Sequence, residues 1–257
     1  MRQKVALGRR RIFAAPLVLV APLGRAQGAR AGESLRYGKA LPAPPAGRWQ
    51  FRVYYGDYAS GIEVALLDYA IEFEGERYRV YTEGRATGIT SLLYSGLLTQ
   101  SSSGRFGANG LVPERYTERR GSRAPREVTL DYRSRTVAFS GKGSVPLRDG
   151  VQDRLSALIQ LGLIARAAPE ALARGASVEI AEATGSELET VAYRSMGETS
   201  LATERGPIRA VHLERVRSGG EGRARAELWL GYDRKLIPVR IRITDKRGHT
   251  LDQVISH

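Results

Sequence analysis

The sequence predicts a mainly β protein: a long, curved antiparallel sheet, shaped as a half-barrel or open barrel, with one covering amphipathic helix. Three observations predict it. Residues 236–244 alternate between apolar and polar side chains, the period expected when one sheet face is buried and the other faces water. Turn signals recur along most of the chain at the spacing of an all-β domain. A helical period of apolar residues occurs at one place, residues 151–163.

The N-terminus, residues 1–26, resembles a cleavable export signal. Residues 1–11 are basic, residues 12–23 form an apolar run, and Gly24-Arg25-Ala26 offers the small residues that a signal peptidase reads. The run is shorter than the roughly 20 apolar residues that span a bilayer, so we expect cleavage rather than an integral membrane protein. Arg10-Arg11-Ile12-Phe13 also resembles the twin-arginine export motif, although Arg9 stands where that motif usually has Ser or Thr. The sequence therefore predicts a protein of the periplasm or a secreted one.

The formal charge of +13 does not indicate a nucleic-acid partner. Six of the 40 basic residues lie in residues 1–26, which contain no acidic residue, so the remainder carries 34 basic and 27 acidic groups, a net +7. These groups are scattered over many predicted strands rather than gathered in one patch, and we interpret them as solvated outer faces. The chain has no cysteine, so its fold depends on its core and not on disulfides.

After the export signal we expect a Pro-, Gly- and Ala-rich linker at residues 27–47 and a single antiparallel β domain at 48–257. Turn residues such as Gly, Asp and Asn separate the apolar runs of the domain, which contains neither an internal repeat nor a second linker. The expected strands are residues 49–55, 62–73, 78–83, 98–106, 113–119, 127–132, 136–140, 177–183, 188–194, 198–202, 208–216, 226–230, 236–244 and 250–255.

Two stretches depart from this pattern of strands. The leucines within residues 89–98 come in adjacent pairs, which two-sided burial or an apolar face presented to another molecule would both explain. Residues 151–163 predict the helix, with Asp149 as its N-cap and a second short turn at 167–174. Its apolar face comprises Val151, Leu155, Leu158, Ile159 and Gly162, and Gln152, Asp153, Arg154 and Gln160 lie away from that face.

Residue types that carry chemistry are sparse. The three histidines stand apart without other metal ligands at suitable spacing, and neither a Gly-x-Ser-x-Gly nor a Ser-x-x-Lys motif occurs. We therefore predict no catalytic residue, no metal and no cofactor. Asp153 and Ser156 are expected to form local hydrogen bonds rather than a catalytic dyad. Four acidic residues could supply a glycosidase-like pair if they met in space: Asp57, Asp68, Glu83 and Glu114.

The chain resembles a bacterial domain-of-unknown-function family of exported proteins. Three segments carry the resemblance: Trp229 through Ile241, Gly110-Leu111-Val112-Pro113, and Asp153 through Leu158. The C-terminal strands also look remotely like those of the periplasmic lipoprotein-carrier and lipoprotein-receptor half-barrels. That likeness implies a curved sheet wrapped around a hydrophobic groove that holds acyl chains, and it implies no catalytic residue.

These observations favour a non-enzymatic periplasmic protein that binds a lipid or another apolar ligand between the sheet and the helix. A structural or interaction module of the cell envelope with a filled core, acting through partner proteins or anionic surfaces, is the alternative. An enzyme acting on envelope glycans is the third hypothesis. The residues expected to line the ligand groove are Leu92, Leu93, Tyr94, Leu97, Leu98, Leu155, Leu158, Ile159, Val239 and Ile241.

Overall fold

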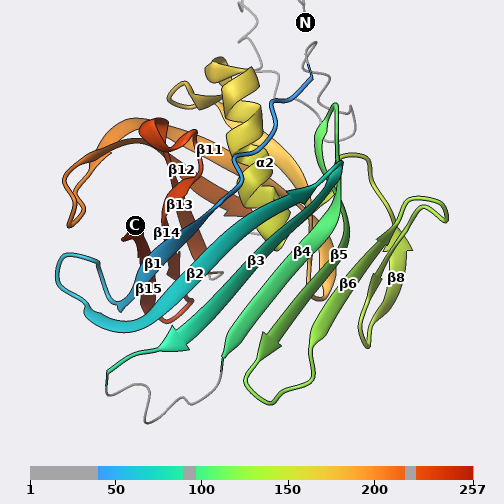
Figure 1. The fold of residues 1–257 in the computed structure, drawn as a ribbon, viewed down its shortest axis with the longest axis horizontal. Helices are drawn as coiled ribbons and strands as arrows, with labels where there is room; N and C mark the ends of the chain where they lie inside the picture. The colour runs from blue at the N-terminus through green and yellow to red at the C-terminus, as the bar shows by residue number, and fades with distance from the viewer. Residues whose placement is uncertain (1–39, 89–96, 218–223, 257) are drawn as a thin grey trace, which may run out of the picture.

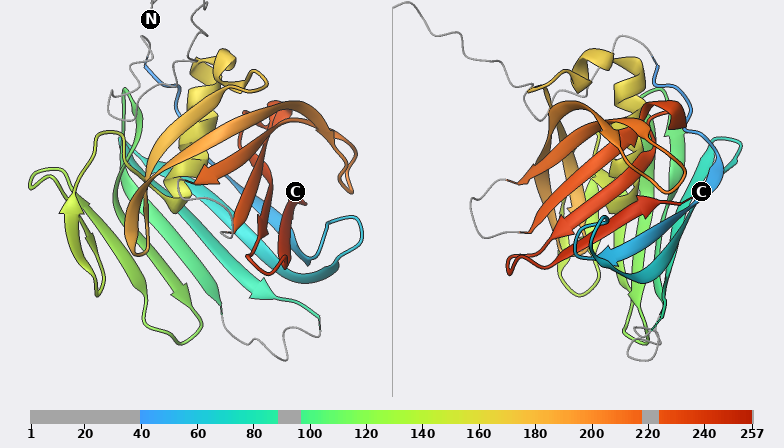
Figure 2. Two further views of the ribbon diagram at one scale, coloured as in Figure 1. Left: turned by 180° about the vertical axis from the view of Figure 1, so that it is seen from behind. Right: turned by 90° about the vertical axis from the view of Figure 1, so that its left-hand side faces the viewer.

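A computed structural model describes residues 40–88, 97–217 and 224–256 of the chain. Within these residues the predicted fold class is confirmed: 15 strands form one open, curved sheet around a single α-helix (Figures 1 and 2). The strands are β1 (Gly47–Tyr55), β2 (Ile62–Glu74), β3 (Arg77–Ala86), β4 (Leu98–Gly107), β5 (Gly110–Arg120), β6 (Arg126–Asp131), β7 (Thr136–Phe139), β8 (Gly143–Pro146), β9 (Gln152–Asp153), β10 (Ser177–Thr184), β11 (Glu187–Leu201), β12 (Ile208–Arg217), β13 (Arg225–Gly231), β14 (Pro238–Thr244) and β15 (Thr250–Ile255). The helix α2 spans Arg154–Ala167, and two short 3-10 helices follow, η1 (Pro169–Leu172) and η2 (Tyr232–Arg234).

Neighbouring strands of the sheet pair antiparallel, apart from β9, which pairs parallel with β10. The order runs from β8 down to β1, continues through β15, and ends at β9. The pairing of β1 with β15 joins the two halves, with Phe51 opposite Ile255. No helix within the described ranges is long and apolar enough to cross a membrane.

The concave face of the sheet, defined here as the face that contacts α2, carries the core. The helix contacts β3, β4 and β5 on one side and β9, β10 and β14 on the other. One continuous apolar cluster fills the space between them, and it includes Leu41 from the predicted linker, whose backbone N–H bonds to the carbonyl of Ala108. The segment just before β1 therefore adds to the core.

The start of α2 differs from the prediction. The N-cap is Asp153 and not Asp149, because Gln152 and Asp153 first pair with β10 as strand β9 and the helix can begin only after them. Three of the four polar residues expected away from the apolar face, Gln152, Asp153 and Gln160, are buried as well, since the two halves of the sheet surround the helix, whereas Arg154 stays exposed. Gln160, for example, bonds through its side chain to the backbone of Asn109 and Leu111.

Two further expectations about strands were wrong. Residues 188–194 and 198–202 belong to one strand, β11, because a bulge between Ser195 and Gly197 absorbs the irregularity without ending the strand. Residues 143–146, for which no strand was predicted, form the edge strand β8. Proline is tolerated at Pro146 because an edge strand has one side free of ladder hydrogen bonds.

Candidate functional site

The predicted groove residues divide into two groups. Leu155, Ile159, Val239 and Ile241 lie in the apolar cluster that fills the space between α2 and the sheet, and Leu158 packs against it while staying partly exposed. Leu92, Leu93 and Tyr94 lie outside the described residues. The space directly under the helix is thus occupied by protein side chains, whereas the ligand-binding role of these residues stays a prediction.

The concave face continues beyond the N-terminal end of α2. Asp153, at that end, meets Ser102 in the middle of β4, and Gln160 meets the turn between β4 and β5, so the helix runs along only one half of these strands. The other half of β4 begins with Leu98, which lies in register with Gly84 and Arg120. Leu98 is partly exposed on this face.

A short row of apolar residues surrounds Leu98. Leu67 on β2 and Leu98 on β4 flank Gly84, where a Cβ atom would lie 3.2 Å from the Leu67 side chain and 3.6 Å from Leu98. The missing side chain at Gly84 lets the two leucines approach each other on one surface. Leu97, which precedes the strand, is 45% exposed.

A polar cluster lies on β4 and β5 beside this row, and we call it the Gln100 cluster. The Gln100 amide donates to Tyr116 Oη and to Glu118 Oε2, both at 2.9 Å. Arg120 donates to Glu118 Oε1 at 2.9 Å, and Arg154, the first residue of α2, lies 3.7 Å from Glu118 Oε2. Both guanidinium side chains remain more than half exposed, at 56% for Arg120 and 51% for Arg154.

The electrostatics of the Gln100 cluster keep Glu118 ionised. Burial by itself would raise the pKa of this carboxyl, but the hydrogen bonds and positive charge of Arg120, with help from Gln100 and Arg154, outweigh it and hold the pKa below its ordinary value. Burial raises the pKa of Tyr116, so its phenol stays protonated and serves as a hydrogen-bond partner. The cluster is a fixed polar surface with a surplus of positive charge at its exposed rim.

Asp153 lies deeper than this cluster and has a structural role. Its carboxylate accepts the N–H groups of Leu155 and Ser156, and the Ser156 hydroxyl accepts the N–H of Asp153 in return, which completes a capping box. The expected local hydrogen bonding of Asp153 with Ser156 is confirmed. Complete burial raises the pKa of Asp153 to about 6. The hydrogen bonds from Ser102 and the helix backbone favour the charged form and lower the pKa, but the effect of burial is larger.

The opposite wall of the concave face carries a second polar cluster. Arg215 on β12 is opposite Tyr193 on β11, and both reach Glu182 on β10. Arg215 also bonds to Glu189 at 3.3 Å. Burial by itself would lower the pKa of Arg215, but the negative charge of Glu182 outweighs it and raises the pKa above its ordinary value, so the guanidinium stays charged while largely buried.

The acidic residues considered as a glycosidase pair occupy ion pairs. Asp68 and Glu83 lie opposite each other on β2 and β3 and share Arg85. Glu114 pairs with Arg105, and Asp57 pairs with Arg242. Within the described part of the chain, no group of three His, Asp or Glu side chains could hold a metal ion.

The sequence reasoning missed a half-buried cluster on the outer face of the C-terminal strands. The face predicted to be wet contains Trp229, which is stacked on His212 at a ring-centroid distance of 4.4 Å and covered by the Arg240 guanidinium at 4.7 Å. Arg240 and Arg242 both bond to the fully buried Asp252, which also accepts the backbone N–H of Tyr58. The β1–β2 loop thus covers this part of the face, and the expectation of a wet face was wrong here.

The geometry of this outer cluster points to stability rather than to a ligand. Burial by itself would raise the pKa of Asp252, but the hydrogen bonds and charges of Arg240 and Arg242 lower it. A signal was present in the sequence, because the strand alternation places Trp229, Arg240 and Arg242 on one face. The loop that covers them comes from the other end of the chain and could not be foreseen.

Comparison with known proteins supports the fold and assigns no activity. A family model described as "Protein of unknown function (DUF3108)" matches residues 50–253. No curated protein matches the chain. Among solved structures, a beta-barrel-like protein of domain of unknown function DUF1849 from Brucella abortus is similar at a TM-score of 0.54 and 11% identity, over 84% of this chain and 98% of that one. At this identity the likeness concerns the fold alone.

Proposed function

Because the chain belongs to the DUF3108 family, whose description assigns no activity, we propose its function from the concave face: it is a non-enzymatic binding protein for an amphiphilic, lipid-class ligand. The observation that carries the proposal is the juxtaposition beyond the end of α2. The partly exposed Leu98 lies in register with Arg120 on the concave face, and Arg154 of α2 reaches the same carboxylate, Glu118, as Arg120.

The two kinds of side chain suit the two ends of an amphiphile. An acyl chain gains about 0.8 kcal/mol for each methylene that it buries, so the apolar row around Leu98 supplies the affinity. An anionic headgroup pairs with Arg120 and Arg154, since Glu118 neutralises only one of these two charges. The residues under α2 belong to the protein core in this proposal, and the ligand lies next to them.

The arrangement of polar groups favours binding over catalysis. Glu118, Glu182 and Asp153 each accept hydrogen bonds from fixed protein donors. A carboxylate that is already satisfied in this way is a poor general base, because proton uptake would break the bonds that hold it. The clusters are therefore better suited to hold a shape than to move a proton.

Lipid mass spectrometry on the purified full chain, followed by titration with a fluorescent fatty acid, tests the proposal. We expect a co-purifying amphiphile and saturable binding of the probe. Leu98→Gln should weaken binding about tenfold, the order expected for the loss of one buried leucine contact. Arg120→Gln should weaken binding of the fatty acid but not binding of the corresponding neutral alcohol.

Arg119 provides the matched control, because it neighbours Arg120 in β5 and points to the opposite face of the sheet. Arg119→Gln should leave both affinities unchanged. Absence of saturable binding by the wild-type chain would refute the proposal, as would an equal loss in the Arg119 and Arg120 variants. Loss of binding in moderate salt without any effect of Leu98→Gln would favour the envelope interaction module instead.

The proposal includes export, for which the N-terminal 26 residues are the sole support. Expression of the full chain in a bacterium, with sequencing of the mature N-terminus, tests it. We expect the mature protein in the periplasmic fraction to begin close to Gln27. An intact Met1 in the cytoplasmic fraction would contradict this part of the proposal.

A further inference from the structure

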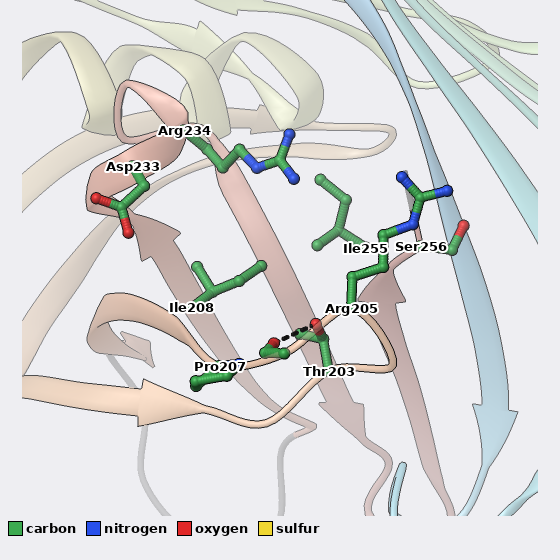
Figure 3. A pocket seen from close by; sticks show the side chains of 9 residues that line it. Thr203, Arg205, Pro207, Ile208, Asp233, Arg234, Ile255 and Ser256 are labelled. Carbon is green, nitrogen blue, oxygen red and sulfur yellow. Dashed lines mark hydrogen bonds between the residues drawn. The ribbon is translucent and has the colours of Figure 1, made fainter.

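A pocket of about 190 Å³ lies at a different place from the proposed lipid surface. The loop between β11 and β12, the helix η2 and the end of β15 enclose it (Figure 3). Its walls include Thr203, Arg205 and Ile208 from the first of these segments, Arg234 from the second, and Ile255 from the third. This region adjoins the C-terminal half of α2, since Gly162 packs against the carbonyl group of Leu236, just after η2.

The backbone around the pocket is held in place. The Thr203 hydroxyl donates to the carbonyl of Gly206 at 2.6 Å, which closes the β11–β12 loop that presents Arg205. Lys235 and Leu236 adopt left-handed conformations, with φ values of 55° and 58°, and end the short helix that presents Arg234. Leu236 is buried against α2. The two arginines therefore project from fixed points of the backbone.

The pocket combines two positive charges with an apolar floor. Within the described ranges neither Arg205 nor Arg234 makes an ion pair, whereas the neighbouring Glu204 is engaged by Arg52. In Figure 3 the two guanidinium groups lie on either side of the Ile255 side chain, and the Asp233 carboxylate points away from them. Ile208 and Ile255 supply the apolar surface below. Guanidinium groups bind carboxylates in a bidentate geometry, which gives both energy and orientation.

We propose that this pocket binds a small organic carboxylate, with the carboxylate held by Arg205 and Arg234 and the apolar body resting on Ile208 and Ile255. A cavity of 150 Å³ accommodates benzene, so a volume of about 190 Å³ suits an anion of about the size of benzoate. The apolar floor distinguishes this ligand from a bare inorganic anion such as phosphate. The site is independent of the proposed lipid surface, and either can fail without the other.

Titration of the isotope-labelled full chain with benzoate, followed by NMR chemical shifts of the backbone amides, tests the inference. We expect saturable shifts confined to the amides of residues 203–206, 208, 233–236, 255 and 256. Arg205→Gln and Arg234→Gln should each weaken benzoate binding about tenfold, the loss expected for one charge-assisted hydrogen bond. The exposed Arg119→Gln serves as the charge control and should change nothing.

Two comparison ligands separate the contributions of charge and apolar body. Benzamide, which has the ring without the charge, should bind at least tenfold more weakly than benzoate, and phosphate should shift the same amides only at much higher concentration. Equal binding of benzamide and benzoate would overturn the inference, and so would phosphate binding as tightly as benzoate. Shifts scattered over the sheet, or an equal loss in Arg119→Gln, would also overturn it. Unchanged dispersion of the variant spectra shows that they are folded.

Discussion

Replacement of Asp153 by Asn should remove a pH-dependent cost from the folded state. The Asp153 side chain is fully buried and caps α2 with one oxygen, while its second oxygen receives the Ser102 hydroxyl. Asparagine keeps the first oxygen as an acceptor for the helix N–H groups. Its NH₂ group can donate to Ser102, whose own hydrogen then turns toward Tyr78, 3.0 Å away. The Asn amide, Ser102 and Tyr78 each keep at least one hydrogen-bond partner after the change.

The magnitude follows from the pKa of Asp153. Burial raises this pKa from its ordinary value of 3.8 to about 6, and each pKa unit corresponds to about 1.36 kcal/mol. The native state thus holds the proton more tightly than the unfolded chain does. The free energy of unfolding falls by about 3 kcal/mol as the pH rises from about 4 through about 6, and this contribution is constant above that. Asparagine is neutral throughout and escapes this loss.

Urea unfolding of both proteins between pH 4 and pH 7 measures the effect. The variant should gain about 2 kcal/mol relative to the wild type over this interval, because the rest of the effect falls below pH 4 and all other titrations are common to both and cancel. Asp149→Asn is the control, since Asp149 is exposed and its pairing with Arg135 is solvent-screened. The two proteins differ in their free energy of unfolding. If this difference changes by less than about 1 kcal/mol between pH 4 and pH 7, Asp153 ionises near its ordinary pKa.

Two further predictions concern buried contacts. Arg215→Met leaves the Glu182 carboxylate buried without its cation and should lower the free energy of unfolding in urea by about 3–5 kcal/mol. The control Arg48→Met breaks an exposed pair and should lower it by less than about 1 kcal/mol. Equal losses in the two variants would refute the assigned burial. Gly162→Ala places a methyl group against the backbone connecting η2 to β14 and should lower the free energy of unfolding by about 1–3 kcal/mol. In the control Gly107→Ala the new methyl group meets open space, so stability should not fall measurably. An unchanged stability of Gly162→Ala would show that α2 packs less closely than described.

Much of the fold follows from local patterns in the sequence. Alternation and turn residues predict the long strands of both halves, because a strand with one buried face shows its period regardless of which strand is its neighbour. The pairing of β1 with β15 has no local signal, since it joins segments about 200 residues apart. The boundary of α2 was missed for a related reason: Gln152 and Asp153 pair with Glu182 and Ala183 on β10, about 30 residues further along the chain.

The candidate sites were less predictable than the fold. Leu98 was identified from its leucine pair, but the guanidinium groups beside it depend on cross-strand register, which places Arg120 opposite Leu98. The pocket of Arg205 and Arg234 is assembled from a hairpin loop, a 3-10 helix and the last strand. Each segment looks like an ordinary turn or strand in isolation. A periodicity argument finds faces of single elements, so it cannot find a cavity that exists only where three of them meet.

The openness of the sheet limits where a ligand can bind. The edges are protected without closing the barrel, since β8 is short and ends at Pro146, while β9 has two residues and passes directly into α2. The helix then fills the space between the two halves, and Gln160, in the middle of the helix, bonds to the backbone at the β4–β5 turn. Concave surface not covered by α2 lies past its first residue, Arg154. Under the proposed function, a ligand of the concave face therefore enters from that side, where Leu98 and Arg120 lie in register at the end of β4 and β5, and it reaches Arg154 at the first turn of α2 afterwards.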